Sequence, residues 1–182
     1  MDCSRNVKFV FSLVAFLFLL FAVLFFSFLR LTPQSERTSF VVPTLTQEQK
    51  AEIKTETSNL TTDKELFDYA VKKAASMLQF SACNNIRNNS ANCIGYAALS
   101  KSYLNYALQI HGKSNKTYHY VGIVSTCGIN LNKILKFFLP IKHKSFVKDH
   151  DFIGMETDNG AVLLASPTLY DLIGNQAFTL IE

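Results

Sequence analysis

The stretch that decides the fold is Asn92-Cys93-Ile94-Gly95-Tyr96-Ala97-Ala98-Leu99. The apolar positions from Ile94 to Leu108 recur at helical spacing, which is typical of one buried helix face. His111-Gly112 is a typical helix end, because glycine tolerates the left-handed backbone that closes a helix. We therefore predict a buried helix over residues 92–110 that opens on a cysteine.

Upstream of this helix, apolar residues also recur at helical spacing between residues 66 and 78. Thr62 or Asp63 is suited to cap a helix that enters at Lys64-Glu65. Residues 84–92 are dense in Asn and Ser, which is typical of a loop. A first helix and a polar connection therefore precede the cysteine.

Downstream, β-branched and aromatic residues predict strands at 118–124, 152–156 and 161–165, with a further strand at 177–181. Asn159-Gly160 joins the middle two strands and is a strong hairpin signal. The apolar, lysine-flanked segment 129–146 is read as a short helix or a flap over a groove. This order predicts an α+β fold, with an antiparallel sheet on one side of the cysteine-bearing helix.

Residues 9–29 contain no charge, proline or glycine. As a helix they would span about 30 Å, the thickness of a bilayer's hydrocarbon core. A cleaved signal peptide is the competing interpretation, but the apolar run is longer than a signal core and no small-x-small cleavage site follows it. We expect a single-pass membrane protein whose C-terminal part lies on the extracytoplasmic side, although the flanking basic residues are nearly balanced.

The predicted organisation is an N-terminal tail at 1–8, an anchor at 9–29, a Thr/Ser-rich stalk at 30–60 and a domain at 61–182. The chain has 18 basic and 14 acidic side chains, without a basic patch interleaved with aromatics. This balance offers no electrostatic basis for binding nucleic acid.

Of the four cysteines, Cys3 precedes the predicted anchor and Cys83, Cys93 and Cys127 follow it. An oxidising compartment would leave at least one of the last three unpaired, and Cys93 is that one if Cys83 and Cys127 bridge. The spacing matches no zinc motif, so we expect no metal or other cofactor.

Cys93 falls in the first turn of its predicted helix, where free N–H groups and the helix dipole favour a thiolate. The competing interpretation is a small buried hydrophobe or half of a disulfide, which is the more common fate of a lone cysteine.

The chain resembles the transglutaminase-like superfamily, which includes bacterial cysteine peptidase-like domains. The resemblance rests on three segments in order: the Cys93-x-Gly-Tyr-Ala motif, Asp149-His150-Asp151-Phe152, and Ser166-Pro167-Thr168. It covers roughly residues 66–171 and implies a papain/transglutaminase-like core.

The resemblance implies that Cys93 is the nucleophile and His150 the general base, an arrangement that suits acyl transfer from an amide. The family's third residue, an Asp that orients the imidazole, falls on Ser166. Ser166 can act as a weaker orienter, or Asp171, Asp149 or Asp151 can supply the charge, or the site has decayed into a binding cleft. Asp151 suits this role least, because alternate strand residues face opposite ways.

These observations predict a membrane-anchored protein with thiol-dependent acyl transfer or hydrolysis of peptide amide bonds, acting on a peptide or protein. The main alternative is a catalytically inactive domain that binds peptide or protein, and a weaker one is a structural domain with Cys93 in a disulfide. The enzymatic prediction requires Cys93 and His150 to meet.

Overall fold

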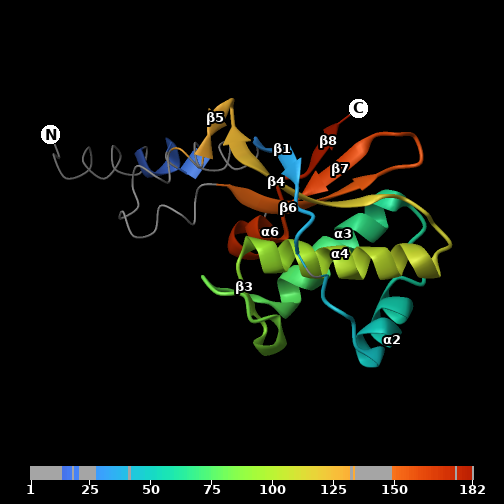
Figure 1. Ribbon diagram of the computed structural model, residues 1–182. Helices are drawn as coiled ribbons and strands as arrows, with labels where there is room; N and C mark the ends of the chain where they lie inside the picture. Colours follow the sequence, from blue (N-terminus) through green and yellow to red (C-terminus); the bar gives the residue numbers. More distant parts are fainter. Residues whose placement is uncertain are drawn as a thin grey trace, which may run out of the picture.

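The computed structural model describes residues 14–17, 19–20, 28–40, 42–131, 133, 149–174 and 176–181 (Figure 1). A sheet lies above a layer of helices, and a chain segment from the first strand descends across the helices (Figure 1). The elements are β1 (Leu29–Glu36), α2 (Gln47–Glu56), α3 (Asp63–Met77), β2 (Gln79–Phe80), the 3-10 turn η1 (Ile86–Asn88), β3 (Ser90–Ala91), α4 (Cys93–Ile110), β4 (Thr117–Thr126), β5 (Ile129–Asn130), β6 (His150–Glu156), β7 (Val162–Ala165), α6 (Pro167–Ile173) and β8 (Thr179–Ile181).

The two predicted helices are confirmed, and each begins at a capping side chain. Thr62 caps α3 through a capping box, in which its side chain and that of Glu65 each bond to the other's backbone N–H. The Asn92 side chain accepts a hydrogen bond from the Ile94 N–H and so places Cys93 at the first helical position of α4. His111 and Gly112, the latter at φ 65°, end α4.

The main sheet is antiparallel, in the order β1-β4-β6-β7-β8, with β5 added beside β4. It is strongly curled. The N–H of Leu31 in the first strand donates to the Thr179 hydroxyl in the last, at 3.1 Å. Leu29 and Leu31 also share an apolar cluster with Phe152 and Leu164 of the central strands. We call the face lined by this cluster the inner face. The antiparallel sheet with packed helices confirms the predicted α+β fold.

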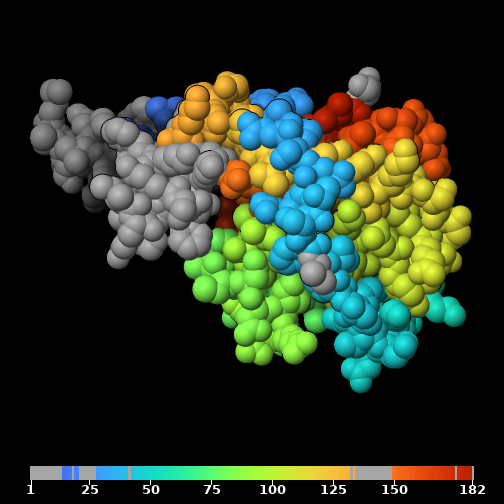
Figure 2. All heavy atoms as spheres, viewed as in Figure 1, coloured from blue at the N-terminus to red at the C-terminus, as the bar shows by residue number. Residues whose placement is uncertain are grey.

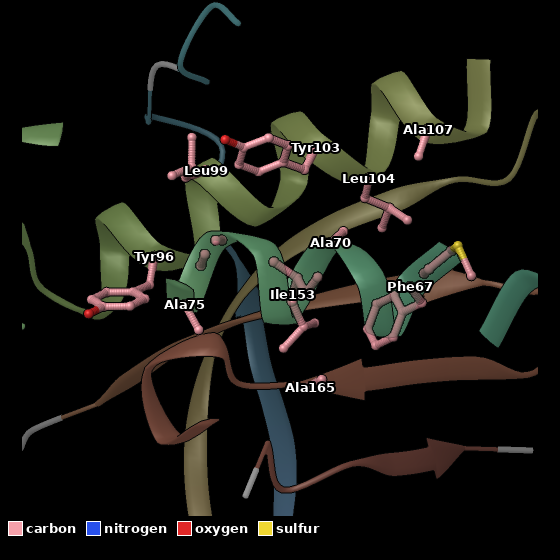
Figure 3. Close-up of a cluster of buried hydrophobic side chains, with 14 of the residues drawn as sticks. Phe67, Ala70, Ala75, Tyr96, Leu99, Tyr103, Leu104, Ala107, Ile153 and Ala165 are labelled. Carbon is pink, nitrogen blue, oxygen red and sulfur yellow. The ribbon is translucent and has the colours of Figure 1, made fainter. Parts of the chain in front are cut away.

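The opposite face, the helix face, carries the larger core. Its side chains come from α3, α4, β6 and β7 (Figure 3). Phe67, Tyr96, Tyr103 and Ile153 are among its fully buried members. A β6 side chain on the helix face therefore packs towards α4, whereas one on the inner face packs inside the curled sheet.

Residues 30–60, expected as a stalk, instead contribute β1 and α2 to the domain. Leu29 and Leu31 alternate with exposed residues in β1 and are buried in the inner cluster, while Ile53 of α2 is fully buried. Thr46 caps α2 with a capping box closed by Gln49. The polar composition misled the prediction, because half-buried edge elements expose most of their residues to water.

Within the part of the chain that the structure describes, no helix combines the length and apolar character needed to cross a bilayer. Most of residues 9–29 and most of the segment 129–146 lie outside the described residues.

Cys83, Cys93 and Cys127 all carry free thiols. The suggested bridge between Cys83 and Cys127 is therefore not formed, and the interpretation of Cys93 as half of a structural disulfide is wrong for this structure.

Candidate functional site

The first two residues of β6 send their side chains to opposite faces of the sheet. His150 precedes Phe152 on the inner face, and their rings stack with centroids 6.4 Å apart. Asp151 precedes Ile153 on the helix face, where Ile153 packs in the larger core. This alternation is a property of any extended strand, so a residue of a helix packed on one face can contact only one of these two side chains.

Cys93 meets Asp151. Its thiol donates to the Asp151 carboxylate, with Sγ and Oδ2 3.7 Å apart, and the backbone N–H of Asp151 also lies against the sulfur. Cys93 is only partly buried, whereas Asp151 is 1% exposed. Cys93, the predicted nucleophile, therefore lies against the Asp151 carboxylate.

Asp151 is the centre of a buried polar cluster that contains Arg37, Cys93 and His119. Arg37 is the residue after the end of β1, and its guanidinium donates two hydrogen bonds to Asp151, from Nε to Oδ1 at 2.5 Å and from Nη2 to Oδ2 at 3.3 Å. His119 Nε2 of β4 lies 2.9 Å from Oδ1. Because a carboxylate can only accept, that nitrogen must carry a proton. We call these four residues the Asp151 cluster.

The electrostatics of this cluster stabilise the carboxylate and disfavour the thiolate. Burial raises the pKa of Cys93 to about 11; the adjacent Asp151 carboxylate adds to this shift, and the backbone N–H groups of Asp151 and, to a smaller extent, Ile94 only partly offset it. Burial on its own would raise the pKa of Asp151, but the hydrogen bonds from His119 and Arg37 outweigh it and hold that pKa below its ordinary value.

His150 belongs to a separate pair on the inner face. Its Nε2 lies 2.7 Å from Ser166 Oγ, which also accepts from the Leu169 N–H and so caps α6. Burial lowers the pKa of His150 to about 4, so the imidazole is neutral near pH 7. The predicted contact between position 166 and the imidazole is present. Ser166 is fully buried, however, so a Ser-His nucleophile here has no access to substrate.

The other acidic residues considered as orienters of His150 have different neighbours. The Tyr96 phenol donates to Asp171 Oδ2 at 2.6 Å, so this carboxylate is tied to α4. The charge of Asp149 acts on Arg37 and raises the pKa of the guanidinium, behind the larger effect of the Asp151 hydrogen bond. Asp151 lies on the opposite face, as strand alternation predicts.

The structure therefore brings together His150 with Ser166, and Cys93 with Asp151, but not Cys93 with His150. Among the described residues, no hydrogen bond joins the Cys93 sulfur to the His150 imidazole. Sequence reasoning missed Arg37 and His119. A signal for His119 was available in the sequence. It alternates with Tyr118 and Tyr120 in a strand, so its side chain is on the opposite face of the sheet from theirs.

Three comparisons, with protein-family models, with curated proteins and with solved structures, found no match. Among the described residues, no group of three or more His, Cys, Asp or Glu side chains is arranged to hold a metal ion.

Proposed function

We propose that this chain carries a catalytically silent transglutaminase-like domain that acts as a peptide- or protein-binding module. The observation that carries the proposal is the partner of Cys93, which is a carboxylate rather than an imidazole. Anchoring to a membrane through the apolar run that begins at residue 9 and ends before β1, with the domain on the extracytoplasmic side, is part of the same proposal.

A carboxylate is the wrong partner for a catalytic cysteine. The thiolate is the nucleophile, and a neighbouring cation or imidazolium is what stabilises it. With a pKa near 11, about one Cys93 side chain in 10⁴ is a thiolate at pH 7. The Arg37 charge that would favour a thiolate is already engaged by Asp151.

The histidine is equally unsuited to the role of base in this arrangement. A pKa near 4 makes the His150 imidazole a weak proton acceptor, and its Nε2 is occupied by Ser166. A general base must reach the proton that it removes, directly or through one water. His150 faces the inside of the curled sheet, away from the helix face that holds the thiol.

Alkylation kinetics test the proposal. We would treat the full chain in detergent with iodoacetamide at pH 7.5 and quantify modification of Cys93 by mass spectrometry. We expect Cys93 to react more slowly than the exposed thiols of Cys83 and Cys127, at a rate that His150→Ala leaves unchanged. Fast, selective labelling of Cys93 that His150→Ala abolishes would overturn the proposal.

One observation favours a second candidate, thiol-dependent acyl transfer or hydrolysis by Cys93. The sulfur lies against the N–H of the peptide bond that joins His150 to Asp151, so a one-residue register shift of β6 would bring the His150 side chain to the helix face in place of Asp151. This candidate predicts the opposite alkylation result, together with covalent trapping of Cys93 by a peptidyl chloromethyl ketone.

A further inference from the structure

A groove of about 830 Å³ lies beside α4, between the arm that links β1 to α2 and the Asn-rich loop before α4. Both segments are on the face shown in Figure 2, the arm in blue and the loop in green. We propose that this groove binds an extended peptide segment bearing a carboxylate, which Arg87 recognises. The inference rests on the proposed binding function and gives it a site.

The groove has the dimensions and the mixed lining of a ligand site. Its volume lies within the range of about 300–1,000 Å³ that is usual for ligand pockets. Leu99 of α4, Ile86 of η1 and Phe40 of the arm supply apolar surface. None of the four residues of the Asp151 cluster lines it, so the groove is separate from Cys93.

The polar part of the lining suits a peptide backbone. Asn85 and Asn89 of the loop and Thr44 of the arm are exposed polar residues of the lining. Each asparagine amide offers both donors and an acceptor, which are the groups that the N–H and C=O of an extended chain require. Such contacts are independent of peptide sequence, so they favour peptide as a class.

Arg87 adds the element of selectivity. It is the one charged side chain among the described residues that line the groove. It is exposed and makes no salt bridge with any acidic group in the described part of the chain. A guanidinium pairs with a carboxylate through two parallel hydrogen bonds, so an acidic side chain or a free C terminus is the complementary group.

The loop is held in shape before any ligand arrives. Backbone bonds join the Asn85 N–H to the Ser90 carbonyl at 2.6 Å and the Ser90 N–H to the Asn85 carbonyl at 3.1 Å. Asn84 accepts from the Asn92 N–H at 2.9 Å and so ties the loop to the start of α4. A preformed wall costs little conformational entropy on binding.

Peptide display tests this inference. A phage-displayed library of random decapeptides with free C termini would be selected against the full chain in detergent, and the selected peptides measured by fluorescence anisotropy. We expect selected peptides to be enriched in Asp or Glu or to bind through their C-terminal carboxylate. Arg87→Gln is expected to weaken binding about tenfold or more, and Asn85→Asp to weaken it through repulsion.

Arg30→Gln is the matched control, because Arg30 is an exposed arginine on β1 outside the groove. It should bind like the natural chain. Selection of no peptide, or equal affinity of the Arg87→Gln and Arg30→Gln variants for the selected peptides, would overturn the inference. Alkylation of Cys93 reports separately on catalytic silence, so failure of the groove and failure of the proposed function give different results.

Discussion

Replacement of Asp151 by asparagine gives the sharpest test of how this carboxylate controls the reactivity of the Cys93 thiol. Asparagine keeps the shape of the side chain but removes the charge that lies 3.7 Å from the sulfur. The change should therefore lower the pKa of the thiol and raise its reactivity. Burial remains as the largest cause of the shift, so the pKa should not fall below that of an ordinary cysteine.

The magnitude follows from the distance. Two unit charges 3.7 Å apart interact by about 1 kcal/mol in water and about 4 kcal/mol at an effective dielectric constant near 20. Cys93 is partly buried and burial remains the largest cause of its raised pKa, so a value nearer the lower limit, about 1–2 kcal/mol or roughly one pKa unit, is appropriate. A fall of roughly one unit from about 11 raises the thiolate fraction at pH 8 about tenfold.

The assay is the rate of iodoacetamide modification at Cys93 between pH 6 and 10, with Asp149→Asn as control. That control removes a carboxylate from the same segment, which acts on Arg37 but makes no hydrogen bond to Cys93 among the described residues.

Asp151→Asn also leaves Arg37 without its ion-pair partner. Breaking a buried pair costs about 3–5 kcal/mol, and less here because the Arg37 side chain is 26% exposed. The double variant Arg37→Gln/Asp151→Asn removes both charges and keeps the test available if the single variant unfolds. An unchanged pH profile of labelling in folded variants would refute the electrostatic explanation.

Three other predictions concern stability. His150 is neutral in the folded chain and must gain a proton when the chain unfolds in acid, so its contribution to the free energy of unfolding is complete above its unfolded pKa of about 6.5 and is lost as the pH falls towards 4. Urea midpoints should show this loss of stability, and His150→Gln should make the loss smaller by about 2–3 kcal/mol. Ser166→Ala removes the cap of α6 and a partner of His150, so the free energy of unfolding should fall by about 1–3 kcal/mol while Cys93 labelling stays the same; faster labelling would show that the two pairs are coupled. Gly122→Ala would push a methyl group into the Thr32 carbonyl of β1, so thermal melts should show a loss of several kcal/mol, with Gly128→Ala in an open turn as the milder comparison; equal effects would refute this packing argument.

Much of the fold could be predicted because its signals are local. The cap of α3, the end of α4 at His111-Gly112 and the Asn159-Gly160 turn act within a few residues, and each formed where the sequence indicates. The same kind of signal was present at Thr46 and Gln49, where a capping box opens α2, but the surrounding composition was read as a stalk. β1 offers less to local reasoning, because its pairing with β4 joins segments about ninety residues apart.

The candidate site shows where sequence reasoning ends. The chain by itself determined that a cysteine opens a buried helix, that a histidine opens a strand, and that residue 166 ends the next strand beside that histidine. Neighbouring strand residues alternate between two faces, and only the packing of α4 on the curled sheet decides which face is turned towards the sulfur. That packing turns Asp151 towards Cys93 and His150 inward, because the strand cannot present both side chains to one helix.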